Sequence, residues 1–70
     1  MNQQIEIVGK DQLDTFELLR VAEDMRSRGV DRYTVRPGND CVWVTYPAGG
    51  VQVDMYYVFD QGRLVDQIVD

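Results

Sequence analysis

Seventy residues make a single small domain, residues 1–70, which can bury only about 60% of the surface of its unfolded chain. The one cysteine, Cys41, excludes an intramolecular disulfide, and a chain without histidine or paired thiols does not predict a zinc site. The net charge of −5 argues against binding to nucleic acid or to an anionic membrane, because both contacts need clustered Lys and Arg. We therefore expect association with another protein to supplement a small core.

The N-terminal stretch MNQQIEIVGK lacks the basic and apolar regions of a secretory signal. No run of the sequence approaches the ~20 apolar residues that a membrane span needs. The sequence predicts a cytoplasmic protein without a membrane partner. Within this stretch, Ile5–Val8 alternates and precedes a glycine, which predicts a short strand whose pairing partner stays open.

The next segment predicts a helix from about Asp11 to Arg28. Asp11 is a good N-cap residue by type, and Gly29 has the position of a C′ glycine. At 100° per residue the apolar stripe consists of Leu18, Val21, Ala22 and Met25, and the polar face of Glu17, Arg20, Asp24 and Arg28.

Two apolar residues near the helix start, Leu13 and Phe16, fall off this stripe. The preferred interpretation is packing under the first strand or loop, as is usual where helices begin. The alternative is an exposed anchor for a partner.

After Gly29 the apolar period changes from 3.6 residues to 2. The segments DRYTVR, CVWVTY, VQVDMYYVF and RLVDQIV predict four strands, and the short turns PGND, PAGG and DQG make them antiparallel neighbours. The fold class is therefore α+β: one α-helix packed on an antiparallel meander sheet, in the order β-α-β-β-β-β. No helix is expected between Cys41 and Val69.

A loop of Ala48 and Gly49 sets the predicted register, in which Tyr46 lies opposite Val51 and Val44 opposite Val53. The other turns place Tyr33 opposite Val42, Phe59 opposite Leu64, and Met55 opposite Ile68. The predicted core contains Val44, Val53, Met55, Leu18 and Met25, and Asp66 also falls on the core face, near the C-terminal edge.

The opposite sheet face has no second helix to cover it, so we expect it to be open. The side chains predicted there are Arg32, Thr34, Arg36, Cys41, Trp43, Thr45, Gln52, Asp54, Tyr56, Val58, Val65, Gln67 and Val69. Trp43 is expected diagonal to Tyr56. A contiguous apolar patch on so small a domain usually marks a site for a partner or for self-association.

Catalytic patterns are absent from the sequence. Ser27 is the only serine and has no histidine to activate it, and Cys41 between apolar neighbours is expected to be a small inert side chain. Asp54 and Asp60 share a face but lie about 20 Å apart by strand rise, too far for acid–base partnership. We expect no enzyme activity, no metal and no cofactor.

A protein-binding site is the remaining prediction. Its residues are Trp43, Tyr56, Val58, Asp54, Asp60, Arg32 and Arg36. Trp, Tyr and Arg dominate interface energetics. The chain after Pro37 has an acidic excess, with Asp40, Asp54, Asp60, Asp66 and Asp70 against Arg63. The preferred explanation of this charge is solubility, and it also permits a partner with a basic surface.

In its acidic excess, lack of catalytic residues and single helix on a meander sheet, the whole chain resembles the small anti-defence proteins of phages and mobile elements, anti-CRISPR proteins above all. The similarity is one of overall type, without a shared motif. It implies a non-catalytic inhibitor of a large nucleoprotein complex, often one that occupies a basic DNA-binding groove. The alternatives are a small homodimeric accessory or regulatory protein whose open sheet face is its own dimer interface, and an antitoxin-like partner.

Overall fold

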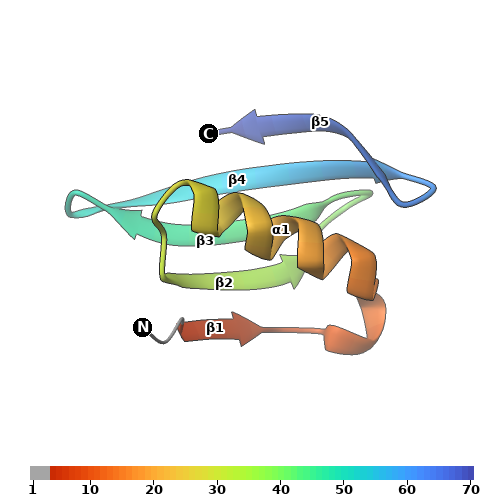
Figure 1. Cartoon of the computed structure of the whole chain (residues 1–70), viewed down its shortest axis with the longest axis horizontal. Coiled ribbons are helices and arrows are strands. Elements are labelled where there is room, and N and C mark those ends of the chain that lie inside the picture. Colours follow the sequence, from red (N-terminus) through yellow and green to blue (C-terminus); the bar gives the residue numbers. More distant parts are fainter. Residues whose placement is uncertain (1–3) are drawn as a thin grey trace.

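One α-helix lies across one face of a five-stranded sheet (Figure 1). The structure is a computed structural model and describes residues 4–70. Its elements are β1 (Gln4–Ile7), a 3-10 turn (Lys10–Gln12), α1 (Thr15–Ser27), β2 (Arg32–Pro37), β3 (Val42–Ala48), β4 (Val51–Asp60) and β5 (Arg63–Val69). The predicted α+β class and element order are confirmed, and residues 41–69 contain no helix.

The first strand, whose partner the sequence left open, pairs with β2 in parallel. The remaining neighbours are antiparallel and follow the chain, so the strand order is β1-β2-β3-β4-β5. A parallel pair needs a long crossover, and α1 supplies it by leading from β1 to β2 (Figure 1). The sheet is therefore mixed but mostly antiparallel.

The helix begins later than predicted. Its N-cap is Asp14, whose carboxylate accepts a hydrogen bond from the backbone N–H of Phe16 at 2.9 Å. Asp11 instead lies in the 3-10 turn, because the chain runs extended through Leu13 and packs that side chain against the core. Phe16 is 74% exposed, so the preferred interpretation holds for Leu13 and is wrong for Phe16.

The hairpin loops lie further along the chain than predicted, which shifts two registers. Val44 pairs with Met55 rather than Val53, around a loop of Gly49 and Gly50. Both glycines have positive φ, 58° and 83°, as the favoured two-residue hairpin turn requires, and a loop through Ala48 would have forced a side chain into that conformation.

The hairpin between β2 and β3 shows the same kind of shift. Val35 pairs with Val44, and the backbone N–H of Gly38 donates to the carbonyl of Cys41, so the loop consists of Asn39 and Asp40 rather than Pro37 and Gly38. Asn and Asp tolerate turn conformations better than most residues. Both shifts are even numbers of residues, so every side chain of β2, β3 and β4 keeps its predicted face.

The core lies between α1 and the sheet. Its buried residues are Val21, Met25, Tyr33, Val35, Val42, Val44, Met55 and Tyr57, with Leu13, Leu18, Val30, Tyr46, Phe59 and Leu64 partly buried around it. Met25, Val44 and Met55 are confirmed as core residues, and Leu18 packs at its edge. Val53 is only half-buried and is not part of the core, because the true register moves it toward the loop.

An irregularity between β4 and β5 reverses the predicted faces of the last strand. Phe59 pairs with Leu64 as predicted, but Val58 pairs with Asp66, which leaves Val65 as an extra residue. From there on Gln67 and Val69 lie on the helix side, and Asp66 and Ile68 lie on the other side. The predictions for these four residues and the pairing of Met55 with Ile68 are wrong.

Asp24 connects the helix to the sheet, although the sequence placed it on the polar face. Its Oδ2 atom accepts hydrogen bonds from the hydroxyl of Tyr57 at 2.5 Å, from Nε2 of Gln67 at 2.8 Å and from Nε of Arg28 at 3.0 Å. Tyr57 is fully buried, and a buried tyrosine hydroxyl needs such a partner. Arg28, four residues after Asp24 on the helix, also forms an ion pair with it.

These contacts shift both ionisable groups. Partial burial would raise the pKa of Asp24, but the hydrogen bonds from Tyr57, Arg28 and Gln67 and the Arg28 charge outweigh it and hold the pKa below its ordinary value of 3.8. Burial, followed by the bond to the Asp24 carboxylate, raises the pKa of Tyr57 well above its ordinary value of 10.0. Asp24 is thus an anion and Tyr57 a neutral donor across the whole neutral range.

Candidate binding face

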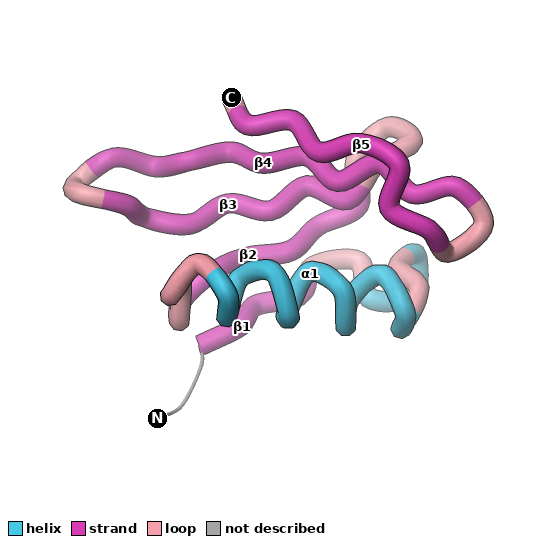
Figure 2. The backbone as a smooth tube through the Cα atoms, turned by 45° about the horizontal axis from the view of Figure 1, so that its top comes forward, coloured by secondary structure: helices cyan, strands magenta, loops and turns pink. Residues whose placement is uncertain are grey.

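The sheet face opposite α1 has no covering element within residues 4–70, and Figure 2 shows the helix on one side of the strands only. We name this surface the open face. Its residues are Gln4 and Glu6 of β1, Arg32, Thr34 and Arg36 of β2, Trp43 and Thr45 of β3, Gln52, Asp54, Tyr56, Val58 and Asp60 of β4, and Arg63, Asp66 and Ile68 of β5.

One row of side chains crosses four strands in the middle of this face. Arg36, Trp43, Tyr56 and Ile68 are successive register partners on β2, β3, β4 and β5. The rings of Trp43 and Tyr56 stack with centroids 6.1 Å apart and planes 22° apart, so the two lie directly opposite each other and not diagonally as predicted. The row gives the face an aromatic centre.

Trp43 is held from three directions. Tyr56 stacks on one side, and the guanidinium carbon of Arg36 lies 4.8 Å from the indole centroid, a cation–π contact. The indole Nε1–H donates to Oδ1 of Asp54 at 3.4 Å, and Nε2 of Gln52 donates to the same oxygen at 3.3 Å. A ring fixed in this way loses little side-chain entropy when a partner covers it.

The β4–β5 half of the face is acidic. Asp54 and Asp66 project there, and the backbone N–H of Asp70 donates to the carbonyl of Asp54, which brings the C-terminal aspartate alongside. Desolvation, followed by the charges of Asp54 and Asp70, raises the pKa of Tyr56 above 10.0. Tyr56 therefore lies in a negative field.

Most of the predicted site residues are brought together. Trp43, Tyr56, Asp54, Val58 and Arg36 lie within one connected area of the open face.

The two others lie at its margins. Asp60 ends β4 opposite Arg63, and Arg32 begins β2, where its Nε donates to the side chain of Gln4 at 3.1 Å. The sequence missed Ile68 and Asp66 as members of the face, because nothing in RLVDQIV marks the extra residue at Val65.

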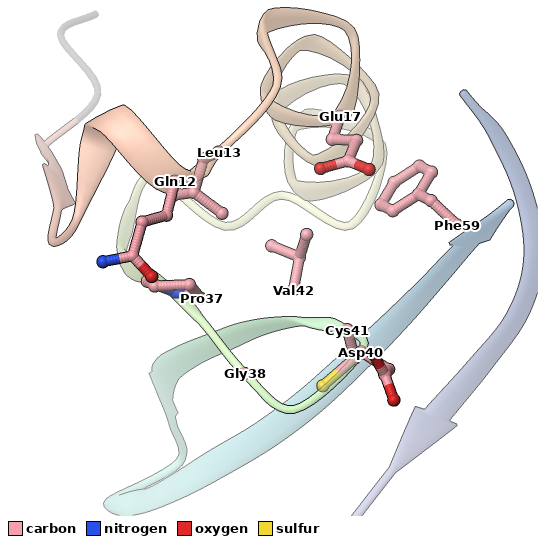
Figure 3. Close-up of a pocket in the computed structure, with 9 residues that line it drawn as sticks. All are labelled: Gln12, Leu13, Glu17, Pro37, Gly38, Asp40, Cys41, Val42 and Phe59. Carbon is pink, nitrogen blue, oxygen red and sulfur yellow. The ribbon is translucent and has the colours of Figure 1, made fainter. Parts of the chain in front are cut away.

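A concavity of about 350 Å³ lies between the start of α1 and the β2–β3 turn (Figure 3). Glu17 of α1, with Asp40 and Cys41 of the β2–β3 turn, are among its lining residues, and Figure 3 shows the Cys41 sulfur turned toward Gly38, away from Val42. The sulfur packs so closely on Gly38 that a Cβ atom there would lie 2.5 Å from Sγ. No basic residue is among the described residues that line this pocket.

Residues 4–70 contain no group of three or more His, Cys, Asp or Glu side chains placed to hold a metal ion. In the same part of the chain, no helix has the length and apolar character needed to cross a membrane.

The sequence was also compared with known proteins: no family model matches it, and neither does any curated protein or solved structure.

Proposed function

We propose that this chain is a non-catalytic protein-interaction domain that binds a partner with a basic surface through its open face. The observation that carries the proposal is the central row, in which the Trp43 ring is fixed by Arg36, Tyr56 and Asp54 and yet has no protein layer above it in residues 4–70. Ordered aromatic side chains in the middle of a face are the usual energetic centre of an interface.

The acidic half supports the choice of a basic partner. Asp54, Asp66 and Asp70 surround Tyr56 on the β4–β5 side, and the net charge of the chain is −5. Charges of this kind speed the encounter with an oppositely charged surface, and the effect declines as salt rises. A DNA-binding groove of a nucleoprotein complex is the basic surface that fits best, because such grooves gather Lys and Arg along the path of a phosphate backbone.

The finer form of the proposal is an inhibitor of a bacterial defence complex, in line with the overall resemblance to anti-CRISPR proteins, acting in the cytoplasm. In this role the domain covers the DNA-binding groove and needs no chemistry of its own. Its open face supplies both requirements, a charged region for approach and an aromatic centre for short-range affinity.

The test is competition between the protein and target DNA for purified CRISPR effector complexes. Trp43→Ala should weaken binding by about 2 kcal/mol, some thirtyfold, mainly through faster dissociation. Asp60→Asn with Asp66→Asn should slow association at low salt and have little effect at high salt. These two carboxylates are preferred to Asp54, whose removal would also release the Trp43 ring.

Phe16→Ala is the matched control, because Phe16 is an exposed aromatic residue on the helix side of the domain. It should leave binding unchanged. Loss of binding in Phe16→Ala with full binding in Trp43→Ala would contradict the proposal and move the site to α1. Absence of binding to every complex tested would reject the inhibitor role.

A further inference from the structure

The charges of the open face are separated into two halves of opposite sign. On the β2 side lie Arg32 and Arg36, and on the β4–β5 side lie Asp54, Asp66 and Asp70, with the aromatic centre between them. The exceptions are Glu6 of the edge strand β1, which lies beside Thr34, and Arg63 of β5, which lies opposite Asp60. A uniformly basic partner matches only one half of such a face.

Arg36, in the basic half, lacks a carboxylate partner in the described part of the chain. In residues 4–70 the one ion pair is that of Asp24 with Arg28, so no carboxylate of the described chain neutralises Arg36. Its Nε atom is buried without a hydrogen-bond partner, and its guanidinium group lies over the Trp43 ring. A guanidinium group with unused donors beside an aromatic ring is a ready site for a carboxylate.

The carboxylates that would satisfy Arg36 lie on the same face, on either side of its row. Asp66 and Asp70 flank Ile68 along β5, and Ile68 occupies the row of Arg36 itself. Three strand spacings, roughly 14 Å, separate β2 from β5, so the two groups cannot meet within one chain. They can meet between two chains.

We propose that the open face binds the open face of a second copy of this chain, related by a twofold axis that runs parallel to the strands between β3 and β4. This rotation places β2 of one copy over β5 of the other. Arg36 then faces Asp66 and Asp70 of the second copy, and Trp43 lies over Tyr56 of the second copy. Each contact occurs twice, as in any isologous interface.

The charges also exclude the other simple arrangement. A twofold axis in the plane of the interface but perpendicular to the strands places each strand over its own counterpart. Arg36 would then approach the basic half of the second copy, and Asp66 would approach the acidic half. Like charges brought together in an interface oppose association, so the axis parallel to the strands is selected.

The area is sufficient for such a dimer. A standard interface buries about 800 Å² on each partner, roughly a sixth of the 4985 Å² that this chain exposes. One face of a two-layer domain has enough area to bury this much surface. Two sheets packed face to face with nearly aligned strands also reproduce the common geometry of a β-sandwich.

The inference uses the same surface as the proposed function and goes beyond it, since the dimer would conceal the surface that the basic partner needs. The free protein would be a dimer, and a partner would compete with the second copy for the Trp43 row. Sedimentation of the protein alone tests this inference without any target. Failure of self-association leaves the inhibitor proposal standing, and failure of target binding leaves the dimer standing.

The experiment is sedimentation equilibrium at about 100 µM protein and low salt, where the unmodified chain should be dimeric. Arg36→Glu places a carboxylate opposite Asp66 and Asp70 of the second copy and leaves Arg32 and Arg63 as the basic residues of the face. Asp66→Arg with Asp70→Arg makes the face mainly basic. Each variant alone should show dimerisation weakened by at least about tenfold. An equimolar mixture of the two should recover it, because each reversed charge then meets an opposite charge in the other chain.

Arg26→Glu is the control, since it makes the same change of charge at an exposed position of α1 and should leave the dimer intact. Circular dichroism verifies that each variant is folded, and Arg36→Gln replaces Arg36→Glu if the latter does not fold. A monomeric unmodified chain overturns the inference. So does a dimer that tolerates the loss of Arg36, or a mixture of the reversed variants that fails to associate.

Discussion

The hydroxyl of Tyr57 and the Oδ2 atom of Asp24 form a hydrogen bond that joins the middle of β4 to α1. Tyr57 is fully buried, and the side chain of Asp24 is 18% exposed, so the bond closes the core on the side where α1 approaches β4 and β5. Hydrogen bonds to ionised acceptors contribute more to stability than neutral ones. This pair makes the position of the helix depend on a polar contact as well as on apolar packing.

Asp24→Ala should lower the free energy of unfolding by about 2–3 kcal/mol, because it leaves the buried Tyr57 hydroxyl without an acceptor. The measurement is urea unfolding followed by circular dichroism. Glu23→Ala, at the exposed neighbouring position, should change stability by no more than about 0.5 kcal/mol. Equal losses in the two variants would show that the Tyr57–Asp24 bond contributes nothing.

Stability should decline at both ends of the pH range. The pKa of Asp24 is lower in the folded state, so its contribution is present above pH 3.8 and is lost as the pH falls through the folded pKa. The pKa of Tyr57 is higher in the folded state, so its contribution is present below pH 10.0 and is lost as the pH rises above that value.

Tyr57→Phe tests the alkaline side of this prediction. The variant should lose less stability above pH 10.0 than the unmodified chain, measured by urea unfolding at several pH values. Burial raises the pKa of Tyr33 as well, so the alkaline decline should be reduced rather than abolished. An unchanged decline would show that Tyr57 ionises equally well in the folded state.

Substitutions of single β4 side chains by alanine test the register of the β3–β4 hairpin. Met55→Ala should cost about 2–5 kcal/mol, because Met55 is fully buried opposite Val44. Val51→Ala, at a residue that is 65% exposed, should cost no more than about 0.5 kcal/mol, and Val53→Ala should fall between the two. A larger cost for Val53→Ala than for Met55→Ala would favour the register in which Val53 faces Val44.

The turn of the same hairpin offers an independent check. Gly50→Ala should destabilise by about 1–2 kcal/mol, because φ at this position is 83°. Gly49→Asn should be close to neutral, since Asn followed by Gly is the favoured sequence for this turn. Thermal unfolding of the two variants measures the difference. Equal melting temperatures would mean that the loop does not require positive φ at Gly50.

The faces of β2, β3 and β4 could be predicted from alternation alone, even where the registers were wrong. Moving Val44 from Val53 to Met55 shifts the pairing by two residues, and side chains repeat their orientation every two residues. Trp43 and Tyr56 were therefore placed on the correct face by an incorrect pairing. Which strand β1 joins could not be predicted, because a four-residue strand carries no information on its neighbour.

Two features could not be predicted from the residue pattern: the bulge at Val65 and the position of the Asp24 carboxylate. Val65 is a good strand residue by type, so its exclusion from the pairing has no marker in the sequence. Asp24 fits the polar stripe of α1 by its spacing, and only the three-dimensional position of Tyr57 shows that its carboxylate lies against the sheet. Both failures concern one long-range contact, since Gln67 reaches Asp24 only when Val65 is left out.

Because of the extra residue at Val65, β5 can pair with β4 in two registers, and each would place a different set of β5 side chains on the open face. If Val65 joined the pairing, Asp66 would come beside Tyr57 and close to the anionic Asp24, and Ile68 would leave the open face. The bond from Gln67 to Asp24 selects the observed alternative. The carboxylate of Asp24, on the helix side of the sheet, thus determines which residues of β5 face a partner on the open face. Deletion of Val65 would make the strand independent of this bond, because the shortened strand has the observed faces without a bulge.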